Sequence, residues 1–403
     1  MKQEYDVIII GGGASGLISA VTAASRGKTV LLLEKTDRPG RKILASGNGR
    51  CNLMNSGTYR YYGDAEFAIQ VMKQCPQSQL IHFFRHWGLM LTEESQGRIY
   101  PVTFQSASVV NMFRKALETV GVSSLLNCHV TSVHRFGKMF SVQTDHNLIY
   151  KSPKVIITCG GAAQSKLGGT YDGYHLLKSF GHKMIPVIPS LVPLKTDARS
   201  ISGLAGIRIR CGVRLIRNNF TIHREEGELL FTDYGISGIC IMQCARFADF
   251  PNTRIELNLL RYSFNDTEEA IKELIRRRTL FSNSSPVWLL NGILPEKLAY
   301  AVLKQSGLPL RGETCSNIDD SALEKIAYTA FCYRIEIYGT KEMEFAQVSA
   351  GGIDCSDFDP VTMESHLISG LYAAGEVLNV DGDCGGFNLM FAFASGMNAG
   401  KSV

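Results

Sequence analysis

The segment YDVIIIGGGASG, residues 5–16, decides the fold of this chain. Its first half is an apolar run that predicts a buried strand from Tyr5 to Ile10, and its second half contains a G-x-G-x-x-G motif. An alanine-rich stretch through about Arg26 predicts a helix, and Thr29 to Leu33 predicts a second apolar strand. Strand, glycine turn, helix and strand form a βαβ unit, the arrangement in which this motif binds a dinucleotide.

Each glycine of the motif has a physical role. Gly11 permits the tight turn, Gly13 lets a pyrophosphate approach the backbone, and Gly16 lets the helix pack closely on the strand. The start of the helix offers free amides and the positive end of the helix dipole to phosphate groups. Glu34 ends the second strand, where a carboxylate accepts hydrogen bonds from a ribose diol.

Motifs later in the chain distinguish between the dinucleotides. Gly40-Arg41-Lys42 and residues 46–52, SGNGRCN, directly follow the second strand and supply amides and cations. An apolar strand from Lys154 to Thr158 runs into Cys159-Gly160-Gly161, where main chain passes close to a cofactor. Both segments are therefore expected to lie close to the cofactor, beside the fingerprint.

Two C-terminal motifs make that choice. Residues 370–376, GLYAAGE, end in an acid of the kind that holds the ribityl hydroxyls of FAD. Gly385-Gly386-Phe387-Asn388 starts a final helix whose amides are expected to face the flavin pyrimidine carbonyl. Because NAD has no ribityl chain and needs no second, distant half-site, the sequence predicts FAD.

The predicted cofactor contacts all lie in or beside these segments. They are Gly11, Gly13, Ala14, Ser15, Gly16, Glu34, Lys35, Gly40, Arg41, Lys42, Gly47, Asn48, Gly49, Arg50, Cys51, Asn52, Val130, Cys159, Gly160, Gly161, Gly375, Glu376, Gly385, Gly386, Phe387 and Asn388. No catalytic residue is assigned. Arg41, Lys42 and Arg50 are candidates for placing positive charge near the flavin or an anionic substrate, with ordinary phosphate or carboxylate pairing as the alternative.

The middle of the chain has a different pattern. Residues 60–120 are expected to be mainly helical, and the prolines between Pro186 and Pro193 predict a break in regular structure at a domain exit. Alternating apolar and basic residues within 207–217 predict half-exposed antiparallel strands. Thr267 to Thr279 predicts an amphipathic helix with Asp266 as its N-cap. The middle therefore reads as a β-rich insert followed by a helical one.

Together these motifs resemble the bacterial BaiN-like, or aminoacetone-oxidase-like, NAD(P)/FAD-dependent oxidoreductases. The resemblance is carried by the fingerprint and by residues 40–42, 46–52, 100–102, 160–161, 168–170, 172–174, 231–232, 235–238, 350–352, 362–365, 375–376 and 381–382. It implies an α/β fold in which a Rossmann-like FAD-binding domain is interrupted by a β-barrel-like insert and a small helical insert.

The expected domain limits follow from the residue patterns and this resemblance. Residues 1–190 and 345–403 are assigned to the FAD-binding domain. Residues 191–260, completed by 332–344, are assigned to the β-rich insert, and residues 261–331 to the helical insert.

Three functions are compatible with such a chain. The first is a reductase that takes hydride from NAD(P)H and delivers it to an activated double bond of a small organic substrate. Residues 160–345 contain no second G-x-G-x-x-G, so NAD(P)H is expected to bind transiently over the flavin. The second is a small-amine oxidase that uses O₂. The third is a flavin-containing, RNA-associated or binding protein with little turnover, for which Arg208, Arg210, Arg214 and Arg217 are expected to share one exposed face.

Composition limits the partners and the compartment. The chain of 403 residues is 45% hydrophobic and 20% charged, and its net charge of +5 includes no long basic run, so we expect a globular protein without a nucleic-acid partner. No apolar stretch is long enough for a membrane span. Eleven scattered cysteines indicate a reducing cytoplasm. The spacings of Cys240 with Cys244 and of His82 with His86 are interpreted as packing, so no metal is predicted. The oligomeric state is left open.

Overall fold

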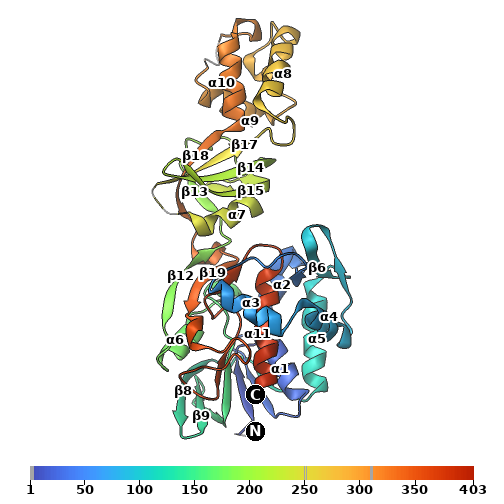
Figure 1. Ribbon diagram of the computed structural model, residues 1–403, viewed down its shortest axis with the longest axis vertical. Helices are drawn as coiled ribbons and strands as arrows, with labels where there is room; N and C mark the ends of the chain where they lie inside the picture. Colours follow the sequence, from blue (N-terminus) through green and yellow to red (C-terminus); the bar gives the residue numbers. More distant parts are fainter. Residues whose placement is uncertain (1–3, 249, 251, 309–311) are drawn as a thin grey trace. The chain divides into compact units, whose positions relative to one another are not determined.

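The computed structural model describes residues 4–248, 250, 252–308 and 312–403 (Figure 1). Its contacts divide the chain into two compact units, each described here by itself. The first, called the Rossmann unit, consists of Met1–Pro189 and Ala346–Val403. The second, called the barrel unit, consists of Ser190–Phe345.

A five-stranded parallel sheet with the order β20-β11-β1-β2-β7 forms the centre of the Rossmann unit. Its strands are β1 (Val7–Ile10), β2 (Val30–Leu33), β7 (Ser123–Leu125), β11 (Lys154–Ile157) and β20 (Leu371–Ala373). Every residue of β1 and β2 is buried, as expected for parallel strands that are covered on both faces. The order places the N-terminal fingerprint beside strands from the middle and the end of the sequence.

The fingerprint helix α1 (Ala14–Ala24) packs against the C-terminal helix α11 (Phe387–Ser402), as Figure 1 shows. The contact is close because small residues face each other. Ser19 Oγ donates a hydrogen bond of 2.7 Å to Gly396 O, and a Cβ on Gly400 would lie 2.7 Å from Ser19 O. Segments from near the N-terminus and the C-terminus of the chain therefore pack against each other within the Rossmann unit.

The remaining elements of this unit surround the sheet. They are α2 (Arg41–Ala45), β3 (Met54–Asn55), β4 (Tyr61–Gly63), α3 (Ala65–Gln74), α4 (Gln77–His86), β5 (Leu91–Glu93), β6 (Arg98–Pro101), α5 (Ser106–Thr119), β8 (Val130–Phe136), β9 (Met139–Thr144), β10 (Ile149–Ser152), α6 (Asp172–Lys178), β12 (Met184–Ser190), β19 (Val348–Ile353) and β21 (Val380–Gly382). Helices α3, α4 and α5 occupy most of residues 60–120, with β4 before α3 and with β5 and β6 between α4 and α5.

The predicted break in regular structure falls at residues 191–193, between β12 and β13 (Leu194–Thr196), and not at the first two prolines. Pro186 and Pro189 both lie inside β12, which pairs with β19 in a two-stranded sheet. A strand with a single neighbour can turn the side that lacks an N–H away from its partner, so prolines are tolerated there.

The barrel unit contains a closed barrel with the strand order β13-β16-β15-β14-β17-β18. Its strands are β13 (Leu194–Thr196), β14 (Arg208–Arg217), β15 (Phe220–Phe231), β16 (Gly235–Ser237), β17 (Thr253–Asn258) and β18 (Tyr333–Thr340). Its helices are α7 (Ile239–Cys244), α8 (Thr267–Leu280), α9 (Glu296–Gln305) and α10 (Asp320–Phe331). The expected α/β class with a Rossmann-like domain and a barrel is confirmed.

Two local predictions in this unit have different outcomes. Asp266 caps α8 by accepting a hydrogen bond of 2.9 Å from Glu269 N, as predicted. The prediction that Arg217 shares a face with the other arginines of β14 is wrong. Arg217 lies opposite Thr253, whose side chain is buried, whereas Arg214 lies opposite Glu256 on the other side of the sheet. Alternation along one strand gives odd and even positions opposite faces.

Candidate cofactor site

The fingerprint glycines have two different surroundings. Gly11 has a φ of +105°, and a Cβ there would lie 2.5 Å from Thr158 O. A Cβ on Gly16 would overlap the carbonyl oxygen of Gly11 and lie 2.7 Å from Thr158 Oγ1. A Cβ on Gly13, in contrast, would meet no atom within 4 Å. Gly11 and Gly16 therefore allow close packing, whereas Gly13 leaves open space in front of α1.

Glu34 is fixed at the end of β2. Its Oε2 accepts a hydrogen bond of 2.7 Å from Gly12 N, and its Oε1 accepts from Thr36 N at 2.8 Å and Thr36 Oγ1 at 2.7 Å. A carboxylate offers about four acceptor positions, so capacity remains for a ligand hydroxyl. The sequence analysis missed Thr36, because a threonine two residues after an acid carries no distinctive signal.

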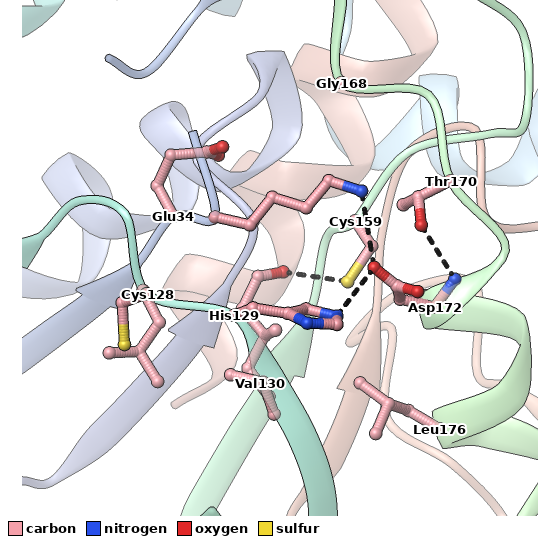
Figure 2. A pocket seen from close by; sticks show the side chains of 13 residues that line it. Glu34, Cys128, His129, Val130, Cys159, Gly168, Thr170, Asp172 and Leu176 are labelled. Carbon is pink, nitrogen blue, oxygen red and sulfur yellow. Dashed lines mark hydrogen bonds and ion pairs between the residues drawn. The ribbon is translucent and has the colours of Figure 1, made fainter. Parts of the chain in front are cut away.

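A pocket lies at the carboxyl ends of β1, β2 and β11, where open α/β sheets bind their ligands (Figure 2). Predicted contacts that line it are Gly11, Glu34, Lys35, Val130 and Cys159, and they are joined by Ile10, Leu33, Cys128, His129, Gly168, Thr170, Asp172 and Leu176. Five residues that were assigned from separate motifs therefore meet at one pocket.

A charged cluster stands beside this pocket. Asp172 Oδ2 lies 3.3 Å from Lys35 Nζ and 3.1 Å from His129 Nε2, and Asp172 N donates to Thr170 Oγ1 at 3.1 Å. Burial by itself raises the pKa of Asp172, but the hydrogen bond with Thr170 and the charges of Lys35 and His129 outweigh it and lower that pKa. Asp172 is therefore an anion that holds Lys35 and His129 at the pocket edge.

The C-terminal acid Glu376 meets residues from two other parts of the chain. Its Oε2 pairs with Lys42 Nζ at 2.8 Å, and its Oε1 accepts from Ser349 N at 2.9 Å and Ser349 Oγ at 3.0 Å. A Cβ on Gly161 would lie 2.5 Å from Glu376 Oε1, and one on Gly375 would lie 2.5 Å from Ser15 Oγ. Gly161, Gly375, Lys42 and Glu376, which are predicted contacts, are thus brought together.

The N-terminus of α11 is built from Gly385 and Gly386, which have φ values of +128° and +107°. Asn55 Nδ2 donates to Gly385 O at 2.9 Å, and a Cβ on Gly386 would lie 2.8 Å from Asn52 Oδ1. Within the described residues, this Asn52 oxygen is buried and has no hydrogen-bond partner. Arg98 Nε lies 3.8 Å from a Cβ placed on Gly385. The sequence analysis missed both Asn55 and Arg98.

Other predicted contacts have roles within the protein. Arg50 donates to both carboxylate oxygens of Glu94, at 3.1 and 3.0 Å, and its guanidinium lies over the rings of Tyr100 and Phe104. Asn388 uses its side chain to bond both the amide and the carbonyl of Gly382, each at 2.8 Å. Carboxylate pairing, the alternative given for Arg50, is therefore present at that residue.

The remaining predicted contacts shape the loops after β2 and β11. Gly40, Gly47, Asn48, Gly49 and Cys51 all have positive φ between β2 and β3, as Gly160 does after β11. Arg41 lies 3.9 Å from Asp37, a weak exposed pair. Phe387 is buried and packs edge-to-face on Tyr61.

Of the cysteines near the site, Cys51 is buried and Cys159 is half-buried at the pocket. Burial raises the pKa of Cys51 to about 11 and that of Cys159 to about 12, so both thiols are neutral near pH 7. Cys244 Sγ donates to Cys240 O at 3.1 Å within α7. In the part of the chain that the structure describes, no group of three or more His, Cys, Asp or Glu side chains is placed to hold a metal ion.

Comparison with known proteins assigns the chain to a family. Residues 5–402 match the HI0933-like protein Rossmann domain. The chain belongs to this family. It is 34% identical over 404 residues to a 3-dehydro-bile acid delta(4,6)-reductase of Clostridium scindens, with 98% of each chain covered. It is 29% identical over 400 residues to a ribosomal RNA dihydrouridine synthase of Escherichia coli, covering 98% of this chain and 96% of that one.

Solved structures agree with the fold. A flavocytochrome c3 fumarate reductase matches with a TM-score of 0.50 and 15% identity, covering 100% of this chain and 78% of that one. A 3-ketosteroid-delta4-(5alpha)-dehydrogenase of Rhodococcus jostii RHA1 matches with a TM-score of 0.50 and 13% identity, covering 100% and 97%. The membership of the HI0933-like family and this fold make the chain an FAD-dependent oxidoreductase.

The residues at the site fit FAD. Gly13 leaves open space at the N-terminus of an 11-residue helix, where a pyrophosphate is stabilised by amides and the helix dipole. The unpaired, buried Asn52 oxygen lies beside the N-terminus of α11, so a donor from a ligand would satisfy it.

Among the helices of the described residues, none has the length and hydropathy of a membrane span.

Proposed function

We propose that this chain uses NAD(P)H to reduce a carbon–carbon double bond that is conjugated to a carbonyl group, in a small organic substrate. The proposal rests on its end-to-end similarity to an enzyme named as a delta(4,6)-reductase of 3-dehydro-bile acids. A double bond at C4 is conjugated with a carbonyl at C3, so its β-carbon accepts a hydride and its α-carbon a proton. A double bond at C6 extends the same conjugated system. The resemblance of its motifs to the BaiN-like reductases supports the same proposal.

FAD supplies the hydride transfer at its N5 atom. The residues of the chain bind and orient the cofactor. The amides at the start of α1 bind the pyrophosphate beside Gly13, and Glu34 accepts hydrogen bonds from the ribose. Glu376, held by Lys42 and Ser349, orients the ribityl chain. We assign no residue as the proton donor.

NAD(P)H is proposed to bind transiently at the flavin. Residues 160–345 contain no second dinucleotide fingerprint, and the barrel in this region is built from antiparallel strands, unlike the parallel βαβ unit that such a fingerprint needs. Electrons therefore enter and leave at one site in two successive half-reactions.

A second candidate substrate is uridine within RNA. Ribosomal RNA dihydrouridine synthases of Escherichia coli and Haemophilus influenzae are each 29% identical to this chain over 98% and 100% of its length. Dihydrouridine is uridine whose carbonyl-conjugated ring double bond has been reduced, so the chemistry is the same. The two candidates differ only in what carries the double bond.

Anaerobic stopped-flow measurements test the proposal. NADH and NADPH are mixed separately with the yellow protein while the flavin absorbance is followed, and we expect one of them to bleach it rapidly. A steroid 4-en-3-one or a uridine-containing RNA is then added to the reduced protein, and reoxidation identifies the substrate class. Reduction by small amines but by neither nicotinamide would contradict the proposal and favour the oxidase.

A further inference from the structure

The outer wall of the barrel carries a row of charged side chains on four neighbouring strands. Arg224 of β15 lies opposite Arg214 of β14, Arg214 lies opposite Glu256 of β17, and Glu256 lies opposite Arg334 of β18. Residues directly opposite in antiparallel strands share one face. The alternate residues of β18, Tyr333 and Ile335, are buried, so the row lies on the outside.

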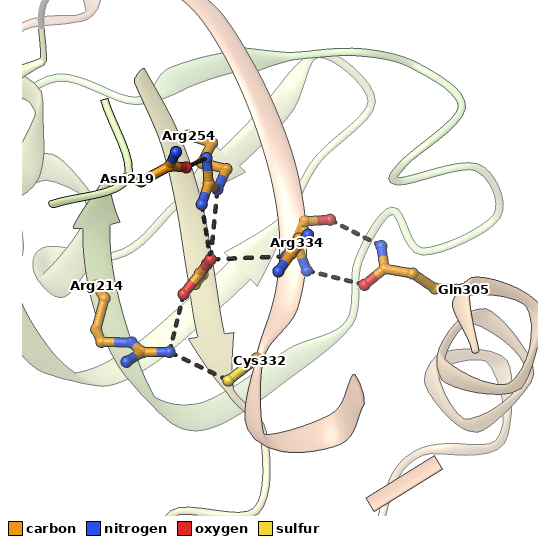
Figure 3. Close-up of polar contacts among 7 residues, drawn as sticks. Arg214, Asn219, Arg254, Gln305, Cys332 and Arg334 are labelled. Carbon is orange, nitrogen blue, oxygen red and sulfur yellow. Dashed lines mark hydrogen bonds and ion pairs between the residues drawn. The ribbon is translucent and has the colours of Figure 1, made fainter. Parts of the chain in front are cut away.

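Positive charge is in excess in this row. Glu256 receives Arg214 at 2.8 Å, Arg254 at 3.3 Å and Arg334 at 3.6 Å, and Figure 3 shows these three guanidiniums turned toward one carboxylate. The side chain of Glu256 is 9% exposed. Arg224 is exposed and has no ion pair within the described residues. The single carboxylate of Glu256 therefore pairs with three guanidinium groups, and the positive charge exceeds the negative charge.

Neighbouring acids do not restore the balance. Glu226, two residues from Arg224, pairs with Arg261 at 3.3 Å. Glu336 lies opposite Arg254 but is exposed, so water screens its charge. Arg214 and Arg224 face each other as like charges, an arrangement that destabilises a sheet. A local conflict of this kind is expected where a surface serves a function.

We propose that the arginines of this row, Arg224, Arg214 and Arg334, together with Arg254 on β17, bind the phosphodiester backbone of RNA. This inference rests on the RNA form of the proposed function. Guanidinium groups match phosphate oxygens in pairs, and side chains on four adjacent strands span about 14 Å, which is long enough for more than one phosphate. The row draws on three separate segments of the sequence.

A groove in the same unit supports a nucleotide chain rather than a single phosphate ion. Gln305 bonds both the amide and the carbonyl of Arg334, each at 2.9 Å. Gln305 also lines a groove between α8, α9 and α10 that includes Glu324, Lys325 and Tyr328, a residue that is 58% exposed. Gln305 therefore links the arginines to a groove with an exposed aromatic, and aromatics with basic side chains bind a single strand by stacking and charge.

The test measures binding of a fluorescently labelled, uridine-containing single-stranded RNA to the full FAD-loaded chain by anisotropy across a salt series. Arg224→Gln and Arg334→Gln are each expected to weaken binding about three- to tenfold and to lower the slope of log affinity against log salt by about 0.7. Arg208→Gln is the matched control, because Arg208 lies on the same face of β14 but pairs with Glu228 at 2.6 Å.

Two results overturn the inference: wild-type protein that does not bind this RNA at low salt, and an Arg208→Gln variant that loses as much affinity as Arg224→Gln. Flavin bleaching by NAD(P)H is measured on the same samples and is expected to stay unchanged. Wild-type protein that does not bind the RNA but is bleached normally defeats only the RNA site on the barrel. Failed bleaching in wild type defeats the proposed reductase without touching the RNA result.

Discussion

The roles of Gly13 and Gly16 in the fingerprint can be separated by one pair of substitutions. Gly13→Ala adds a methyl group where no atom lies within 4 Å, and Gly13 has a φ of −78° that alanine adopts without strain. The stability of the apoprotein is therefore expected to change by about 0.5 kcal/mol or less. The same methyl occupies the space that we assign to the pyrophosphate, so FAD binding is expected to weaken about 10- to 100-fold.

Gly16→Ala has the opposite expectation for stability. Its methyl group overlaps the main-chain oxygen of Gly11 and lies 2.7 Å from Thr158 Oγ1. A backbone atom cannot rotate away, so α1 must move off the sheet at a cost of about 3 kcal/mol or more. In a unit of this size, that cost lowers the Tm by about 6 to 12 °C.

The assay compares both variants with wild type after removal of FAD. Thermal unfolding followed by circular dichroism gives the Tm of each apoprotein, and quenching of flavin fluorescence gives the Kd for FAD. Gly339→Ala is the control, because Gly339 of β18 has no atom within 4 Å of its Cβ position, needs no positive φ and lies in the barrel unit. An unchanged Kd for Gly13→Ala would refute the assigned pyrophosphate position, and an unchanged Tm for Gly16→Ala would refute the close helix–sheet contact.

Three further predictions concern individual side chains. Lys42→Met leaves Glu376 held by Ser349 alone, and we expect FAD binding to weaken about fivefold, or about 1 kcal/mol; Lys115→Met, in an exposed pair on α5, is the control. Burial, opposed by Asp357, lowers the pKa of His182, so its neutral form favours folding above pH 6.5 and this stability is lost as the pH falls below it. The Tm of wild type should therefore drop more than that of His182→Gln between pH 7.5 and 5. Iodoacetamide at pH 8 should label Cys51 and Cys159 only after unfolding in urea.

Each of these has a contrary result. A Lys42→Met protein that binds FAD as tightly as wild type would mean that the ion pair does not position Glu376. Parallel Tm curves for wild type and His182→Gln would show that His182 does not titrate over this range. Rapid labelling of either thiol in the folded protein would contradict the raised pKa of both and the burial of Cys51.

Local order in this chain was predictable because its determinants lie close together in sequence. The strand, turn and helix around Gly11 to Gly16 need only about 30 residues, and the pattern of apolar residues with a cap at Asp266 suffices to place α8. A glycine in the sequence can indicate a close approach to the backbone without naming the partner. Gly161 is an example, because its partner Glu376 is identified only in the structure.

Several polar partners could not be predicted. Ser349, Asn55 and Arg98 have no distinctive spacing in the sequence, and each acquires its role from a segment that lies far away along the chain. Asn55, for example, bonds Gly385, which is 330 residues away. A hydrogen bond of this kind leaves no periodic signal, because only the folded chain brings its donor and acceptor together.

The sequence predicts a dinucleotide site at residues 5–16 without the fold, because turn geometry and helix capping depend on neighbouring residues. It also predicts that an acid near the C-terminus, Glu376, holds the ribityl chain. Only the tertiary structure joined Lys42, Ser349 and Glu376, and only strand register set Arg224, Arg214, Glu256 and Arg334 in one row. Register decides which face and which partner each residue has, since a slip of one residue reverses every side chain.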